Sequence, residues 1–195
     1  MSIEDELIAI GKELTPNFTI TEADAPYYDS LVKYFISVQK GYKKGLYIAG
    51  QVGTGKTLSL KVMQKMFGGF TIVSSRHLVR EFMKSKTNGM EVLDQYGRDS
   101  FVKDANGNRD IKKPIHLCID DLGLDEVNSK LYGNQVNIFM EILLDRYECW
   151  IDYGLRTLIT TNASPKIMEE SYGTRVRERM REMCEYITIT GDSKR

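Results

Sequence analysis

Long hydrophobic runs are missing from this sequence of 195 residues. No apolar segment approaches the roughly 20 residues that a membrane-spanning helix needs, which argues against a membrane protein. The first residues, from Met1 to Glu6, are acidic and lack the basic and then apolar order of a secretory signal. We therefore expect a cytoplasmic protein with no membrane partner.

Cysteine and histidine are also scarce. Cys118, Cys149 and Cys184 lie far apart without a C-x-x-C pair, and His77 and His116 do not complete a metal-ligand set with them. An odd number of thiols without metal spacing indicates reduced, mostly buried cysteines. A metal centre built from thiols or imidazoles is therefore not expected.

The sequence has no excess of charge of one sign and no internal repeat. Lys and Arg together number 27, as do Asp and Glu, so the net charge neither indicates nor excludes a nucleic-acid partner. The composition, with 42% hydrophobic and 28% charged residues, is that of a globular protein with one main domain.

The hydrophobic pattern divides the chain into an N-terminal helical extension over residues 1–20 and one larger domain over residues 21–195. Strands are expected at 46–49, 70–73, 115–119, 155–160 and 186–190. Helices are expected at 3–14, after residue 24, and at 57–67, 75–86, 90–96, 133–150, 165–171 and 174–183, and a hairpin-like insertion at 99–113. Strands alternating with helices predict a three-layer α/β/α fold around a mainly parallel five-stranded sheet.

A glycine-rich segment has the spacing of the Walker A phosphate-binding loop, and it lies between an expected strand and an expected helix. The segment reads Gly50-Gln51-Val52-Gly53-Thr54-Gly55-Lys56-Thr57. Glycines let backbone N–H groups approach phosphate oxygens, and the start of the helix adds its positive dipole end. We expect Lys56 to meet the β- and γ-phosphates and the Thr57 hydroxyl to bind Mg²⁺. Because no N/T-K-x-D guanine-reading motif is present, ATP is the expected nucleotide.

Two acidic residues end the third expected strand. Asp120 and Asp121 follow a mostly apolar segment, and ligands of open α/β sheets bind at the carboxyl ends of the strands. Asp120 is expected to hold Mg²⁺, mostly through water. Asp121 is the candidate to orient or deprotonate the attacking water. The alternative for both is that they cap the turn at Leu122-Gly123.

A polar residue also ends the fourth expected strand, in the run Leu158-Ile159-Thr160-Thr161-Asn162. Asn162 is placed to sense the γ-phosphate or to position water. Equally, it fits the cap or turn residue that precedes Pro165. The residues alone leave both interpretations open.

With these elements in this order, the chain resembles the AAA+ ATPases, and more closely the DnaC/DnaI-type helicase loaders and the related IstB-type transposition ATPases. The likeness covers roughly residues 20–195 and rests on the segments 50–57, 119–123, 159–162 and 172–180. It implies an AAA+ core, here expected without the C-terminal helical lid that many AAA+ proteins have. Helicase loaders usually carry a longer N-terminal region that grips the replicative helicase.

The resemblance also assigns arginines. In this family a run like Tyr172-Gly173-Thr174-Arg175-Val176-Arg177-Glu178-Arg179-Met180 carries an arginine finger that acts on a neighbouring subunit. Alignment of the run makes Arg179 the first candidate and Arg175 the second. The end of the chain resembles the family's terminal motif and makes Arg195 the candidate sensor-2 arginine. For Arg177 and Arg181, ordinary ion pairs along the helix are the alternative.

Contact with single-stranded DNA is expected mainly from the resemblance. Basic residues with aromatic neighbours suit a single strand, although a merely solvated surface explains them equally well. The basic candidates are Lys40, Lys43, Lys44, Arg76, Arg80, Lys84, Lys86, Lys103, Arg109, Lys112 and Lys113, with Tyr42, Tyr96 and Phe101 nearby.

The leading hypothesis is an ATP-hydrolysing AAA+ protein of DNA replication. It is expected to load a replicative helicase on single-stranded DNA and to self-associate on ATP. One alternative is a transposition helper ATPase whose partner is a transposase. Another is a small-molecule P-loop kinase, against which Asp120-Asp121 and the arginine run argue.

Overall fold

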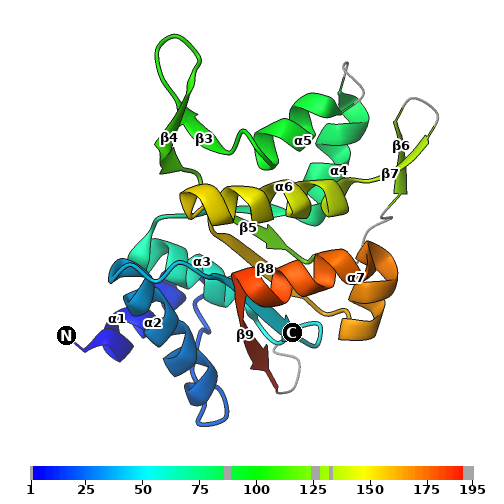
Figure 1. The fold of residues 1–195 in the computed structure, drawn as a ribbon. Helices are drawn as coiled ribbons and strands as arrows, with labels where there is room; N and C mark the ends of the chain where they lie inside the picture. The colour runs from blue at the N-terminus through cyan, green and yellow to red at the C-terminus, as the bar shows by residue number, and fades with distance from the viewer. Residues whose placement is uncertain (1, 86–88, 124–127, 132–133, 191–195) are drawn as a thin grey trace.

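The computed structural model describes residues 2–85, 89–123, 128–131 and 134–190, and its centre is a parallel sheet (Figure 1). The sheet has five strands in the order β2-β5-β8-β1-β9, and all neighbouring strands run parallel. Its strands are β1 (Gly45–Gly50), β2 (Thr71–Ser74), β5 (Leu117–Asp120), β8 (Thr157–Thr161) and β9 (Cys184–Ile189).

Helices cover both faces of this sheet. One face carries α1 (Ile3–Leu14), α2 (Ala25–Gln39) and α3 (Lys56–Phe67). The other carries α4 (Ser75–Lys84), α5 (Met90–Tyr96), α6 (Ile138–Tyr153) and α7 (Pro165–Met183). Alternation along a strand separates the two cores, since Leu46 and Ile48 of β1 face the first set of helices and Tyr47 faces the second. The fold is therefore the expected three-layer α/β/α arrangement.

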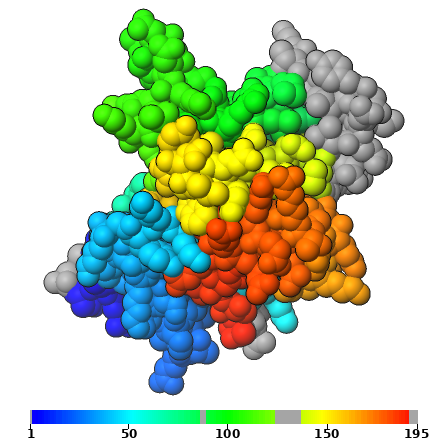
Figure 2. All heavy atoms as spheres, in the orientation of Figure 1, coloured from blue at the N-terminus to red at the C-terminus, as the bar shows by residue number. Residues whose placement is uncertain are grey.

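Two antiparallel hairpins lie outside the main sheet. One pairs β3 (Phe101–Lys103) with β4 (Arg109–Pro114) and extends away from the body of the protein (Figures 1 and 2). This hairpin confirms the expected insertion. The other pairs β6 (Asn128–Leu131) with β7 (Asn134–Asn137) and was not expected.

The expected helix over 133–150 is wrong at its start. Residues up to Asn137 are in β7, and α6 begins only at Ile138. The Asn137 side chain caps the helix, because its oxygen accepts a hydrogen bond from the backbone N–H of Met140 at 3.0 Å. The apolar stripe of α6 continues helical spacing into the residues before it, which hid this boundary.

The other expected elements are confirmed with ends shifted by a few residues. The two expected C-terminal helices are confirmed as the two parts of α7, which Gly173 separates with a non-helical φ of 82°. The three cysteines are buried, as expected. Among the described residues, no helix is long and apolar enough to cross a bilayer.

The N-terminal segment packs on the main domain. Helix α1 contacts α3, and Leu7 and Phe18 are buried in the same cluster as residues of α2 and α3. The proposed division of the chain at residue 20 stays a prediction.

Arg146 of α6 is fully buried and ties several elements together. Its guanidinium donates hydrogen bonds to the Thr157 hydroxyl at 2.8 Å, to the Ser100 hydroxyl at 3.0 Å and to the Tyr96 carbonyl at 2.8 Å. The carbonyls of Ile115 and Arg156 accept two more, at 3.4 and 2.9 Å. Burial lowers the pKa of this guanidinium to about 9. A cation held by neutral oxygens thus fixes the base of the β3–β4 hairpin to the sheet.

Candidate nucleotide and magnesium site

The glycine-rich loop connects β1 to α3 at the carboxyl edge of the sheet. Gly53 and Gly55 have φ values of 86° and 92°, which a side chain would disfavour. Gly55 is the N-cap of α3 and brings no side-chain cap, so the first amides of the helix are not bonded by a capping side chain. Backbone N–H groups at the start of a helix are a favourable environment for an anion.

Lys56 is folded against this loop. Its side-chain ammonium donates hydrogen bonds to the carbonyls of Gly50 at 2.8 Å and Gln51 at 2.9 Å, and only 5% of the residue is exposed. The Thr54 hydroxyl also donates to the Gln51 carbonyl, at 2.9 Å. Val52 of the same loop is 56% exposed. The lysine thus sits inside the loop, where a phosphate would meet it.

Thr57 and Asp120 come together although they are far apart in sequence. The Thr57 hydroxyl donates to the two carboxylate oxygens of Asp120 at 2.9 and 3.0 Å. Thr57 belongs to the first turn of α3, and Asp120 ends the neighbouring buried strand β5 and is 7% exposed. A hydroxyl and a carboxylate are the hard oxygen donors that Mg²⁺ prefers. The residues present therefore fit a magnesium ion.

Thr160 is a site residue that sequence reasoning missed. It is completely buried in β8, and its hydroxyl donates to the Asp120 carboxylate at 2.7 Å while accepting the Asp121 backbone N–H at 2.8 Å. Its position could have indicated this role, because β8 lies beside β5, the strand that ends in Asp120, with Ile119 and Ile159 paired in the sheet. One hydroxyl therefore orients both acidic residues.

Asp121 has an unusual backbone. Its φ of 57° makes it the one residue other than glycine with a positive φ in the described part of the chain. Aspartate tolerates this conformation better than most residues, at a cost of about 1 kcal/mol. Thr160 holds its N–H, and the Ser75 hydroxyl donates to its carbonyl at 2.9 Å. Both peptide groups of the residue are thus fixed from neighbouring elements.

Asn162 follows β8 at the same edge. Ser164, not Asn162, caps α7, because the Ser164 side chain accepts the N–H of Ile167 at 3.2 Å. The cap alternative for Asn162 is therefore wrong. Its side-chain oxygen is buried and has no hydrogen-bond partner among the described residues. A buried acceptor of this kind calls for a water or a ligand.

The arginines of α7 differ in their surroundings. Arg179 lies over the Tyr147 ring, 4.6 Å from its centroid. Arg181 pairs with Glu178 at 3.3 Å, three residues away, as the helix-pair interpretation expected. Arg177 is also paired, but with Glu169 at 2.9 Å, eight residues away across the Gly173 interruption, which is not an ordinary helix pair. Arg175 is exposed. Arg195 lies outside the described residues.

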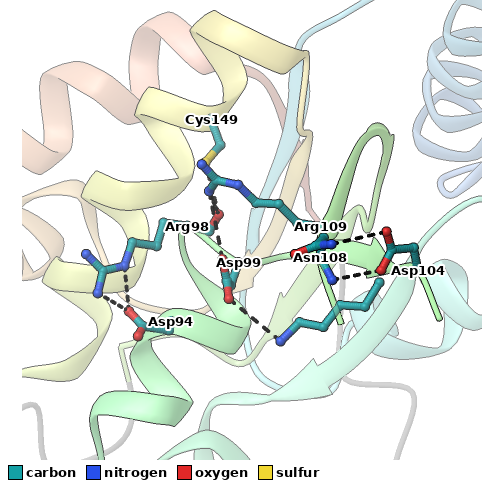
Figure 3. Close-up of polar contacts among 8 residues, drawn as sticks. Asp94, Arg98, Asp99, Asp104, Asn108, Arg109 and Cys149 are labelled. Carbon is teal, nitrogen blue, oxygen red and sulfur yellow. Dashed lines mark hydrogen bonds and ion pairs between the residues drawn. The ribbon is translucent and has the colours of Figure 1, made fainter. Parts of the chain in front are cut away.

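Acidic neighbours offset much of the positive charge of the β3–β4 hairpin. Figure 3 shows Arg109 directed toward Asp99, and this ion pair measures 3.8 Å. Lys103 lies 3.7 Å from the same carboxylate, and Lys113 lies 3.5 Å from that of Asp110. At the other end of the hairpin, the Asp104 carboxylate accepts hydrogen bonds from the backbone N–H groups of Asn106 and Asn108, and so stabilises the turn.

Solved structures with a similar arrangement of strands and helices include DnaI and the DnaC helicase loader. DnaI has a TM-score of 0.60 and 22% identity, with 90% of this chain and 90% of that chain covered. The DnaC helicase loader has a TM-score of 0.55 and 17% identity, with 91% and 96% covered. This chain therefore shares the fold of DnaI and of the DnaC helicase loader. A replication initiator DnaA bound to AMPPCP and single-stranded DNA has a TM-score of 0.60 and 17% identity; the match covers 91% of this chain and 49% of that one.

Sequence comparisons are less informative. A stretch of 95 residues is 28% identical to Myosin-16 of Arabidopsis thaliana; it makes up 47% of this chain and spans only 7% of that protein's length. No protein-family model matches the chain.

Proposed function

We propose that this protein binds and hydrolyses ATP with Mg²⁺ and acts in DNA replication as a helicase loader on single-stranded DNA. The observation that carries the ATPase proposal is the convergence of Lys56, Thr57 and Asp120 at one edge of the sheet. The fold shared with DnaI and the DnaC helicase loader supports the replication role. We also propose that the protein acts in the cytoplasm.

The loop and Lys56 would hold the triphosphate. The ammonium would exchange the Gly50 and Gln51 carbonyls for phosphate oxygens, which form stronger charge-assisted hydrogen bonds. Thr57 and Asp120 would hold Mg²⁺, which supplies charge neutralisation for the phosphate oxygens when bound. The hydrogen bond from Thr57 to Asp120 keeps both of these metal ligands oriented before the ion binds.

Asp121 is the proposed general base or water-orienting group. Its backbone is held by Thr160 and Ser75, so its carboxylate projects from a fixed main chain. Asn162, with a buried oxygen that no described residue bonds, would place the attacking water or contact the γ-phosphate. The rest of the stabilisation of the transferred phosphoryl group would come from an arginine of another subunit.

Of the two finger candidates, the contacts favour Arg175. A trans-acting arginine must reach a neighbouring subunit, and Arg175 is exposed. Arg179 packs over Tyr147 of its own chain, and one of its guanidinium nitrogens is buried. We infer that assembly brings Arg175 of one copy to the phosphates bound by the next, which makes hydrolysis depend on self-association.

ATP turnover as a function of protein concentration tests this function. Turnover per subunit should rise steeply with concentration, and single-stranded DNA should raise it further. A kinase would instead respond to a metabolite and would not depend on assembly. Purified replicative helicase should bind in the presence of ATP; a transposase that binds in its place would favour the transposition helper. Turnover independent of concentration and of DNA would contradict the proposal.

A further inference from the structure

A cavity lies at the edge of the sheet opposite the nucleotide site. Phe70, His116 and Arg156 immediately precede β2, β5 and β8, so they gather at the amino ends of three neighbouring strands. They line a cavity of about 210 Å³ together with residues of α2 and the end of α3. A strand rises about 3.3 Å per residue, and each of these strands has only a few residues. The cavity therefore lies roughly 15 Å from Asp120.

Aromatic rings form one side of this cavity. Phe35 of α2 is stacked on Phe67 and on Phe70, with ring centroids 5.5 Å apart in both pairs and interplanar angles of 11° and 23°. All three rings line the cavity. Between Phe67 and Phe70 stand Gly68 and Gly69, where an added side chain would meet only open space. The rim of the cavity therefore carries no side chains at Gly68 and Gly69, and the three phenylalanine rings beside it form a flat apolar wall.

Arg156 brings a positive charge into these apolar surroundings. Its backbone is held at both ends, since its N–H donates to the His116 imidazole at 3.0 Å and its carbonyl accepts from Arg146 at 2.9 Å. Its guanidinium forms no hydrogen bond or ion pair with any residue that the structure describes, although it is half-buried. Burial lowers the pKa of Arg156, because the partly apolar surroundings solvate its charge less well than water does.

His116 adds a second donor. Its Nδ1 accepts the Arg156 N–H, so the proton of the neutral ring is on Nε2. Burial and the nearby charges of Arg156 and Arg146 lower the pKa of His116 to about 4, which keeps the ring neutral near pH 7. In the described part of the chain nothing accepts a hydrogen bond from that Nε2–H. A guanidinium and an imidazole N–H thus line the same cavity without acceptors.

We propose that this cavity binds a small carboxylate that also bears a single aromatic ring, with Arg156 and His116 holding the carboxylate and Phe35, Phe67 and Phe70 contacting the ring. The charge of Arg156 selects an anion, and a planar guanidinium pairs with a carboxylate through two parallel hydrogen bonds. The stacked phenylalanines favour a flat apolar group beside it. The cavity is smaller than the roughly 300 Å³ at which pockets for drug-sized ligands begin, so one ring fills it.

Titration with 3-phenylpropionate, without nucleotide, tests the proposal independently of the proposed ATPase function. Binding in the millimolar range or tighter is expected by calorimetry and ligand-observed NMR. The neutral isostere 3-phenylpropanamide should bind at least about tenfold more weakly, because it cannot form the charged pair. Equal binding of the acid and the amide, or no binding of the acid at about 10 mM, would overturn the proposal.

Two variants locate the site. Arg156→Met keeps the length of the side chain without its charge and should weaken binding of the acid at least about tenfold. Val38→Phe places a ring in the cavity, which Val38 lines, and should abolish binding. Arg98→Met, which removes an exposed arginine that does not line the cavity, is the matched control. If the folded Arg156→Met and Val38→Phe proteins bind like the wild type, the ligand binds elsewhere and the assignment is wrong.

A further arm of the same titration asks whether the carboxylate belongs to a peptide C-terminus or to a small aromatic acid. The tripeptide Gly-Gly-Phe carries the same ring and carboxylate at a chain terminus, and its C-terminal amide is its control. Binding of the tripeptide as well as the acid would assign the site to peptide C-termini. Binding of the acid alone would assign it to small aromatic acids.

Discussion

The hydroxyl of Thr160 lies 2.7 Å from the carboxylate of Asp120 and donates a hydrogen bond to it. The same oxygen accepts the N–H of Asp121. The proposed metal ligand and the proposed base are therefore oriented by one buried side chain of the neighbouring strand. Groups that orient metal ligands in this way typically change metal affinity or activity by about 10–100-fold when removed.

Replacing Thr160 with valine tests that arrangement. Thr160→Val keeps the shape of the side chain and leaves the Asp121 N–H and one Asp120 oxygen without this partner. We expect turnover to fall by about 10–100-fold and the Mg²⁺ requirement to rise, with ATP still bound. The measurement is turnover as a function of Mg²⁺ concentration.

Thr161→Val is the matched control for that substitution. It removes a buried hydroxyl one position along the strand, which donates to the Leu122 carbonyl and accepts the N–H of Ala163. It should affect stability more than the Mg²⁺ dependence. An unchanged Mg²⁺ requirement in Thr160→Val would show that Thr160 does not orient the site.

The arginine finger is tested by mixing subunits. Arg175→Ala should bind ATP normally and lose about a thousandfold or more in turnover. Asp121→Asn, whose asparagine suits the positive φ, should bind but not hydrolyse. A mixture of the two variants should regain turnover, because Asp121→Asn supplies the arginine and Arg175→Ala supplies the intact acids.

Arg177→Ala is the control for the finger, because Arg177 is paired with Glu169 in its own chain. It should keep most of the turnover. If Arg179→Ala abolishes turnover and Arg175→Ala does not, Arg179 is the finger despite its contact with Tyr147.

The buried Arg146 should contribute strongly to stability, because it fixes the base of the β3–β4 hairpin to the sheet. Arg146→Met would leave several buried carbonyls and hydroxyls without donors, so we expect a loss of about 3 kcal/mol or more in the free energy of unfolding. Urea unfolding measures it. The control Arg98→Met breaks an exposed pair with Asp94 and should cost about 1 kcal/mol or less. A loss for Arg146→Met no greater than the control's would refute a structural role.

Stability should also depend on His116. The folded protein holds its pKa at about 4, whereas the ordinary value is 6.5. Between these values the unfolded chain binds a proton that the folded chain does not, so stability falls as the pH is lowered from 6.5 toward 4. The total loss is at most about 3 kcal/mol. His116→Gln should flatten this part of the urea-denaturation profile, with His77→Gln as control; an unchanged slope in His116→Gln would contradict it.

The sequence was sufficient for those parts of the fold that depend on local pattern. The glycine spacing before Lys56 and the acidic end of β5 predicted that Thr57 and Asp120 lie close together, because the carboxyl ends of parallel strands share one edge. The start of α6 was missed, since its helical spacing extends backward past Asn137. Each of these features depends on residues that are close together in the sequence.

Contacts between distant elements were not predictable in the same way. The double role of Thr160 depends on the pairing of β5 with β8. The burial of Arg146 depends on the carbonyls of Tyr96, Ile115 and Arg156 and on the hydroxyls of Ser100 and Thr157. An arginine in an amphipathic helix is usually at the surface. Likewise, nothing near Arg156 in the sequence indicates that His116 and Phe35 line the same cavity.

The central claim is that the glycine-rich loop and Lys56 bind the triphosphate of ATP, and calorimetric titration with Mg²⁺ and a non-hydrolysable ATP analogue tests it most directly. The wild-type protein should bind one nucleotide, and Lys56→Ala should bind at least about a hundredfold more weakly, a difference of about 2.7 kcal/mol. Lys65→Ala, at the exposed end of the same helix, should bind like the wild type. Equal affinity of Lys56→Ala and the wild type would contradict the account.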